Sequence, residues 1–187
     1  MFAITPQMMS NFFNSISKFI ILLSIILIVV AGVLIIFLEN DYYQGISFKI
    51  MFIHVPAAWL SLMIFVSMGI SSIIGLIFKS PTSFTISRSL SPVGLIMSIM
   101  VLITGSIWGN LTWGTYWVWD ARLTSMLILA FIYLGHLFLL YSFEHFQKAD
   151  FAASILAIIG MVNIPIVKFS VDWWTTLHQG SSVFKVS

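Results

Sequence analysis

The chain has 187 residues, of which 60% are hydrophobic and 7% are charged, and its mean hydropathy is +1.08. A composition this apolar excludes an ordinary soluble domain and indicates an integral membrane protein. The sequence contains no cysteine, which excludes disulfides, thiolate metal ligands and the Cys-x-x-Cys-His attachment of a c-type haem. The net charge of +2 and the lack of a basic cluster argue against nucleic acid as a partner.

Apolar stretches of about 20 residues, each long enough to cross a roughly 30 Å hydrocarbon core as a helix, follow one another along the chain. They lie at residues 19–38, 56–78, 90–108, 123–143 and 151–170. The sequence therefore predicts an all-α, polytopic transmembrane helix bundle with five spans, built as a single integral membrane domain over residues 1–187 and surrounded by the lipid bilayer. We expect the first stretch to be retained as an anchor, because it is too long for a signal-peptide core and no small-residue cleavage site follows it. Gly105 and Gly109, at the end of the third stretch, are interpreted as permitting close helix packing.

The five spans assign each connecting segment to one side of the membrane. Residues 39–55, 109–122 and 171–187 share one side, and the N-terminus, residues 79–89 and residues 144–150 share the other. Lysine and arginine divide equally between the two sides, so the positive-inside rule does not orient the chain. All seven tryptophans are expected at the first side. An aromatic belt would place them at both interfaces, so this asymmetry indicates a binding site, with an interfacial anchor as the alternative.

The stretch "WGTYWVWDAR", residues 113–122, holds three of these tryptophans. In an extended backbone Trp113, Trp117 and Trp119 share one face, and in a helix the first two still lie one turn apart. Either arrangement predicts an aromatic shelf for a flat, apolar ligand, with each ring covering about 150 to 250 Å². Asp120 is interpreted as the cap of the next helix. Arg122 either extends to the lipid headgroups or pairs with a carboxylate of the ligand.

Two of the four histidines are expected on the tryptophan side. We interpret Pro56 as the first residue of the second helix, which places His54 at the mouth of that helix. His178 follows the last span. Two neutral imidazoles that approach from opposite faces could ligate a haem iron. His136, within the fourth span, is interpreted as hydrogen-bonded between helices, and His145 as a solvated loop residue.

Three motifs between Lys18 and Ser182 resemble those of the CcmC family, which belongs to the wider group of WWD-domain membrane proteins. The motifs read "IHVPAAW", "WGTYWVWDARLTS" and "DWWTTLHQGS" and occur in the order found in the family. Members of this family are the haem-handling subunits of the multicomponent cytochrome c maturation pathway. The family ordinarily has six spans, whereas only nine residues follow His178 here, so we expect the sixth span to be missing and the His178 loop to be less firmly held.

The resemblance implies that the WWD loop, residues 109–122, holds haem b non-covalently and in transit at the outer membrane surface. It implies that the axial ligands of the haem iron are His54 and His178. It also implies two further sets of residues. Those that contact the haem from the WWD loop are Trp113, Gly114, Trp117, Trp119 and Asp120, and those that contact its propionates are Arg122 and Lys49. The family often has arginine at the position of Lys49. The second propionate contact would therefore come from the compact ammonium of a lysine and not from the planar guanidinium of an arginine.

The resemblance also implies partners and a location. Haem would pass to the haem chaperone CcmE, with the help of the ATP-binding-cassette pair CcmA and CcmB and the small subunit CcmD. The chain would lie in a bacterial or mitochondrial inner membrane, with the WWD loop facing the periplasm or the intermembrane space. The expected role is binding and transfer, and not enzymatic catalysis.

Two other functions use the same features. A WWD-type cytochrome c haem lyase would share the aromatic shelf, but such proteins usually have a larger soluble region or more spans. A membrane transporter of haem or of another solute would need a polar pathway, and only His136 and Lys168 are ionisable groups well inside the spans. Asn163 and Pro165 could break the fifth span as in transporters, although a proline kink is the commoner meaning.

Overall fold

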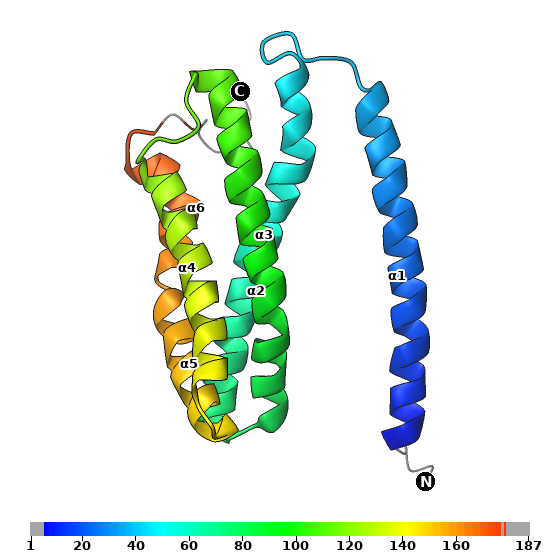
Figure 1. The fold of residues 1–187 in the computed structure, drawn as a ribbon, viewed down its shortest axis with the longest axis vertical. Coiled ribbons are helices and arrows are strands. Elements are labelled where there is room, and N and C mark those ends of the chain that lie inside the picture. Colours follow the sequence, from blue (N-terminus) through cyan, green and yellow to red (C-terminus); the bar gives the residue numbers. More distant parts are fainter. Residues whose placement is uncertain (1–5, 177, 179–187) are drawn as a thin grey trace. The chain divides into compact units, whose positions relative to one another are not determined.

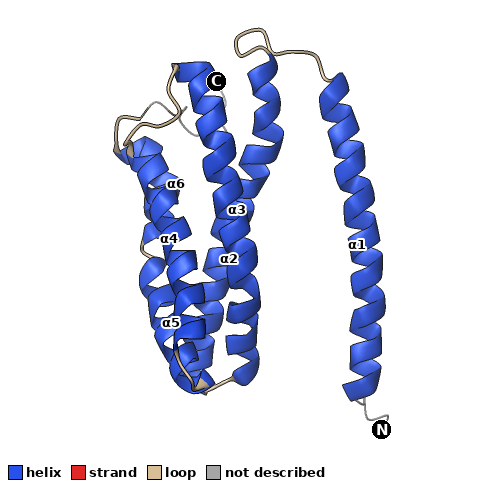
Figure 2. Ribbon diagram, viewed as in Figure 1, coloured by secondary structure: helices blue, strands red, loops and turns tan. Residues whose placement is uncertain are grey.

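The structure is a computed structural model that describes residues 6–176 and 178, and every regular element in that part of the chain is a helix (Figures 1 and 2). The all-α prediction is therefore confirmed. Tertiary contacts divide the chain into an N-terminal unit, Met1–Lys49, and a second unit, Ile50–Ser187.

The N-terminal unit consists mainly of helix α1 (Pro6–Phe37). Its apolar side chains from Phe19 to Phe37 are mostly exposed, as expected for a helix that lipid surrounds. A tight turn follows, in which Oδ1 of Asp41 accepts hydrogen bonds from the backbone N–H groups of Tyr43 (2.9 Å) and Gln44 (2.8 Å). The 3₁₀ helix η1 (Ile46–Ile50) then leads into the second unit.

The second unit is a bundle whose successive candidate spans alternate in direction (Figure 1). They are α2 (Met51–Phe78), α3 (Pro81–Trp113), α4 (Ala121–Ser142), α5 (Phe146–Gly160) and α6 (Asn163–Trp173). Helices α5 and α6 follow one another in the same direction and together form one candidate span, Phe146–Trp173. Counting α1, the described part of the chain has five helical segments long and apolar enough to cross a membrane, which confirms the predicted number.

The start of α2 differs from the prediction. Pro56 lies inside the helix, which begins at Met51, so its interpretation as the first helical residue is wrong. The 3₁₀ helix η1 already gives the backbone a helical course ahead of α2, and the fixed φ of Pro56 lies in the helical range, although a proline donates no N–H to the helix. His54 consequently lies in the first turn of α2 and not in the segment before it.

The fifth span is divided at Met161 and Val162, between α5 and α6. Pro165 has no N–H to donate to the Met161 carbonyl oxygen, which instead accepts a hydrogen bond from the N–H of Ile164 (3.1 Å). The Asn163 side-chain amide donates to the Ser125 carbonyl oxygen of α4 at 2.8 Å. The structure therefore shows a break, held to α4 by Asn163, in place of a simple proline kink.

A buried cluster of large side chains holds the middle of the bundle together. The Phe65 and Tyr133 rings meet edge to face with their centroids 5.0 Å apart, and the Tyr133 hydroxyl donates to the Ser61 carbonyl oxygen at 2.7 Å. Gly94 is required beside them, because a Cβ atom there would lie 2.2 Å from the Tyr133 ring. This packing links α2, α3 and α4.

Buried hydroxyl groups add polar contacts between the same helices. The Oγ atoms of Ser61 and Ser98 lie 2.7 Å apart, and those of Ser72 and Ser87 lie 3.1 Å apart, so two serine pairs join α2 to α3. The Ser87 hydroxyl also lies 3.3 Å from Nε2 of His136, which is 1% exposed. The interpretation of His136 as a histidine hydrogen-bonded between helices is confirmed.

Candidate functional site

The predicted WWD loop lies at the end of the bundle where α3 ends, α4 begins and the chain leaves α6 (Figure 1). Its predicted bounds, residues 109–122, are too wide, because α3 continues to Trp113 and α4 begins at Ala121. Trp113 is the last residue of α3, and Gly114 follows it with a left-handed φ of 75° while its N–H bonds to the Asn110 carbonyl oxygen. Glycine adopts this conformation at low cost, which explains its place between the helix and the aromatic segment. Asp120 is the N-cap of α4.

The tryptophan rings of the loop stand edge to face. The Trp117 and Trp119 centroids are 5.5 Å apart with an interplanar angle of 78°, and the Trp113 ring lies 5.0 Å from the His178 ring at 74°. Trp119 is 77% exposed, so a large aromatic surface is open to contact. Nε1 of Trp117 is buried and has no hydrogen-bond partner within the described ranges, which leaves a buried donor available to a ligand.

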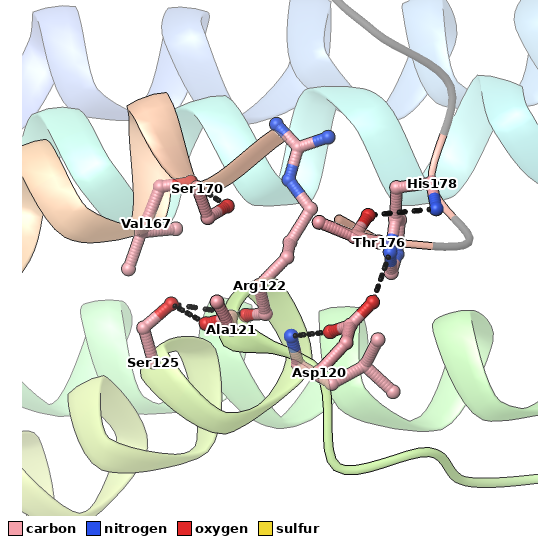
Figure 3. Close-up of polar contacts among 9 residues, drawn as sticks. Asp120, Ala121, Arg122, Ser125, Val167, Ser170, Thr176 and His178 are labelled. Carbon is pink, nitrogen blue, oxygen red and sulfur yellow. Dashed lines mark hydrogen bonds and ion pairs between the residues drawn. The ribbon is translucent and has the colours of Figure 1, made fainter. Parts of the chain in front are cut away.

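Asp120 uses its two carboxylate oxygens for two different tasks (Figure 3). Oδ1 accepts a hydrogen bond from the N–H of Leu123 at 2.7 Å, which confirms the predicted helix cap. Oδ2 lies 3.0 Å from Nδ1 of His178. A carboxylate can only accept, so Nδ1 carries the proton and Nε2 of a neutral His178 keeps its lone pair.

The surroundings of His178 favour the neutral imidazole. Burial lowers the pKa of His178 below its ordinary value, and the positive charge of Arg122 acts in the same direction. The hydrogen bond and the charge of Asp120 oppose these effects without cancelling them. His178 is therefore neutral near pH 7, the form in which Nε2 can ligate a metal.

His54 is held to α3 by a hydrogen bond at Nδ1, as His178 is held to Asp120. Its Nδ1 lies 2.9 Å from Oγ1 of Thr104, and that hydroxyl already donates its hydrogen to the Met100 carbonyl oxygen at 2.7 Å. With the hydroxyl hydrogen directed at Met100, Nδ1 of His54 is the donor and the lone pair stays on Nε2. The ring also meets the Trp108 ring edge to face at 5.7 Å.

Thr104 and Gly105 lie beside the His54 ring, and no pattern in the sequence singled out Thr104. A Cβ atom at position 105 would lie 2.9 Å from Cε1 of His54, so the glycine gives the imidazole its place against α3. Gly105 was interpreted as a packing glycine, and the structure shows what packs there. The spacing alone could not have identified His54 as its neighbour, because 51 residues separate the two positions.

Arg122 lies in the first turn of α4, half-buried, and Figure 3 shows its side chain directed away from the Asp120 carboxylate. It forms no ion pair within residues 6–176 and 178, although the charges of Asp120 and Asp172 act on it. The charge of Arg122, and that of His178 when it is protonated, in turn act on His54. The structure thus brings His54, His178 and Arg122 into one neighbourhood beside the WWD loop.

Lys49 belongs to the N-terminal unit, where its ammonium donates a hydrogen bond to the Ile36 carbonyl oxygen at 3.1 Å. Its predicted contact with a ligand carboxylate stays a prediction.

Comparison with known proteins gives consistent matches. The model of the family described as "Heme exporter protein C", CcmC, matches residues 1–187. A mitochondrial protein of Marchantia polymorpha, whose name describes it as ccmC-like and assigns it to cytochrome c biosynthesis, is 51% identical over 144 residues, or 77% of this chain and 60% of the relative. The Heme exporter protein C of Bradyrhizobium diazoefficiens is 47% identical over 79% of this chain and 56% of its own length. That of Escherichia coli K12 is 46% identical over 78% of this chain and 60% of its own length. The chain therefore spans little more than half of the length of these relatives.

Proposed function

Because this chain belongs to the CcmC family of haem exporter proteins, we propose that it binds haem at the membrane surface during cytochrome c maturation and passes it on. The haem is b-type, held non-covalently and in transit. The single observation that carries this proposal is the matched state of two histidines: His54 and His178 are each held through Nδ1, and each keeps the Nε2 lone pair for a ligand. Hydrogen bonds of this kind orient histidines that ligate metals.

In this proposal His54 and His178 ligate the haem iron from opposite faces. The ligands come from different elements, the first turn of α2 and the segment after α6, and the electrostatic coupling of His54 to His178 supports their convergence. Haem supplies a flat ring and two carboxylates. Trp113, Trp117 and Trp119 cover the ring with aromatic surface.

The carboxylates of haem require cationic partners. The guanidinium of Arg122 forms no ion pair with a carboxylate within the described ranges. Its planar, forked set of N–H donors suits the carboxylate of a propionate. Lys49 is the second proposed partner. Gly114 and Asp120 act indirectly, because the glycine sets the course of the loop and the aspartate orients His178.

We extend the proposal to the rest of the pathway on the basis of family membership. Haem passes from this site to the chaperone CcmE, and the chain works with CcmA, CcmB and CcmD. The WWD loop faces the periplasm or the intermembrane space, at a bacterial or mitochondrial inner membrane. The exposed face of Trp119 supports release toward an external acceptor.

The test is the absorption spectrum of the purified chain, with and without reductant, after expression with ample haem. We expect His54→Ala and His178→Ala each to alter the Soret band, and added imidazole to restore it, because imidazole can fill the vacated axial position. His145→Ala is the matched control, since His145 is exposed at the opposite end of the bundle, at the start of α5. A colourless wild-type preparation, or a normal spectrum in both histidine variants, would contradict the proposal.

A further inference from the structure

Lys168 is a cation within a candidate membrane span whose role the haem site does not explain. It lies in α6, half-buried, and its ammonium is 4.3 Å from the centroid of the Trp59 ring of α2. This distance is that of a cation–π contact. An ionisable group in a membrane span usually has a partner or a function.

The Lys168–Trp59 pair faces away from the haem site. On α6, Asn163 and Val167 are buried toward the bundle, and Lys168 is turned about 100° to 140° from both at 100° per residue. On α2, the step of five positions from His54 to Trp59 turns the helix by about 140°. Trp59 is 49% exposed. The pair therefore lies at a partly exposed surface of the second unit.

The neighbours of this pair are apolar and exposed. Leu60 is 48% exposed and Met63 60% exposed on α2, and Phe169 is 44% exposed on α6. In residues 6–176 and 178 the only lysine or arginine that pairs with a carboxylate is Arg88, with Asp150, so no carboxylate there neutralises Lys168. Asp172 follows one helical turn later without forming that pair.

The depth of Lys168 matches the boundary between hydrocarbon and headgroups. Lys168 precedes Trp173 and Trp174 by one and a half turns, a rise of about 7.5 Å along the helix. These two exposed rings are of the kind that sits at headgroup level. The four-carbon stem of a lysine lets its ammonium extend part of this way toward the headgroups.

We propose that Lys168 and Trp59 form a binding site for an anionic phospholipid of the leaflet that borders the WWD loop. The phosphate pairs with the Lys168 ammonium, which the Trp59 ring holds in place. The acyl chains lie along the exposed apolar side chains of α2 and α6. This site is separate from that proposed for haem, and it does not depend on haem binding.

The experiment is native mass spectrometry of the full chain, released from nanodiscs that contain equal amounts of phosphatidylglycerol and phosphatidylcholine. The wild-type chain should retain phosphatidylglycerol in preference. Lys168→Met should lower the retained phosphatidylglycerol about fivefold, the equivalent of about 1 kcal/mol for one charge at an anionic surface. Lys148→Met, which removes an exposed lysine near the start of α5, is the matched control and should retain the lipid as the wild type does.

Two further variants keep the test decisive if Lys168→Met folds poorly. Lys168→Arg preserves both the charge and the cation–π contact and should retain the lipid, whereas Trp59→Leu should lose part of it. Equal retention of the two lipids by the wild-type chain would overturn the proposal without any variant. Wild-type retention by a folded Lys168→Met chain would overturn it as well.

Discussion

The carboxylate of Asp120 connects the stability of a helix with the state of a histidine. Oδ1 caps α4 and Oδ2 holds His178. Replacement by alanine removes both contacts, whereas asparagine preserves the cap, since it is as good an N-cap residue as aspartate. The Asn variant therefore isolates the effect on His178.

The pH dependence of His178 follows from the direction of its pKa shift. Its folded pKa is lowered, so the neutral imidazole contributes stability that is present above the unfolded pKa of about 6.5 and is lost as the pH falls through the folded pKa. Asp120 opposes this lowering. We expect Asp120→Asn to move the His178 titration of the ligand-free protein to lower pH, measured by NMR of the imidazole nitrogens. Arg122→Gln should move it to higher pH. A titration that moves the opposite way in either variant would contradict this account of the site.

Gly105 offers a second test at the level of one residue. Gly105→Ala places a Cβ atom 2.9 Å from Cε1 of His54, so the ring or the helices must shift. We expect a loss of about 1 to 3 kcal/mol in the free energy of unfolding, as overpacking usually costs, and a weaker haem spectrum. The control is Gly32→Ala in α1, where no atom lies within 4 Å of the new methyl group. If both variants melt like the wild type, the close contact with His54 has no structural importance.

The sequence predicted the helix cap at Asp120 but not the hydrogen bonds between residues far apart in the chain. The cap at Asp120 follows from a local rule, because an aspartate precedes a helical stretch, and it was predicted. The hydrogen bond between Asp120 and His178 joins residues 58 positions apart, and the one between His54 and Thr104 joins residues 50 apart. No local pattern encodes such pairs.

At the scale of elements, the WWD loop is bordered by two capped helix ends and carries an exposed tryptophan, Trp119. Gly114 ends α3, Asp120 starts α4, and the rings between them stand edge to face.

Replacing Trp113, Trp117 and Trp119 together by alanine should weaken haem retention about 100-fold, since each ring contributes roughly 1 kcal/mol beyond area burial. The measurement is haem content per protein after purification. The corresponding phenylalanine variant keeps aromatic surface and should retain more haem. Unchanged haem content in the alanine variant would leave the rings as interfacial anchors.

Helix existence was predictable and helix limits were not. Each apolar stretch corresponds to a helical segment, because 20 apolar residues in lipid must satisfy their backbone internally. The helices of the bundle begin before or end after those stretches, since polar and aromatic residues continue the helix past the hydrocarbon. The break at Met161 depends on the contact of Asn163 with α4, which only the packed bundle supplies.

At the scale of the whole molecule, the alternation of helices places connecting segments at opposite ends of the second unit. The loop after α3 lies at one end, and the α2–α3 and α4–α5 turns lie at the other (Figure 1). This arrangement agrees with the assignment of sides by counting spans.

Cysteine labelling tests that topology directly, because the chain contains no cysteine of its own. Tyr116→Cys, in the WWD loop, should react with a membrane-impermeant maleimide from one compartment. Thr82→Cys and Glu144→Cys, at the two opposite turns, should react only from the other. Tyr42→Cys, in the turn after α1, should behave like Tyr116→Cys by span parity. Reaction of Tyr116→Cys and Glu144→Cys from the same compartment would refute the five-span arrangement.

The serine pairs between α2 and α3 also bear on how the chain enters the bilayer during synthesis. Helix α3 carries Ser87 and Ser98 on its buried face, and their partners Ser72 and Ser61 lie on the helix made just before it. Only Lys79 and Ser80 separate the two helices. If α3 lay alone among acyl chains, these hydroxyls would lack their partners on α2, although Ser98 would keep its hydrogen bond to the Gly94 carbonyl oxygen. Pairing with α2 lowers the cost of placing them in lipid. The two helices are thus suited to leave the translocon together as a hairpin, and we expect their serine contacts to form before the WWD loop is synthesised.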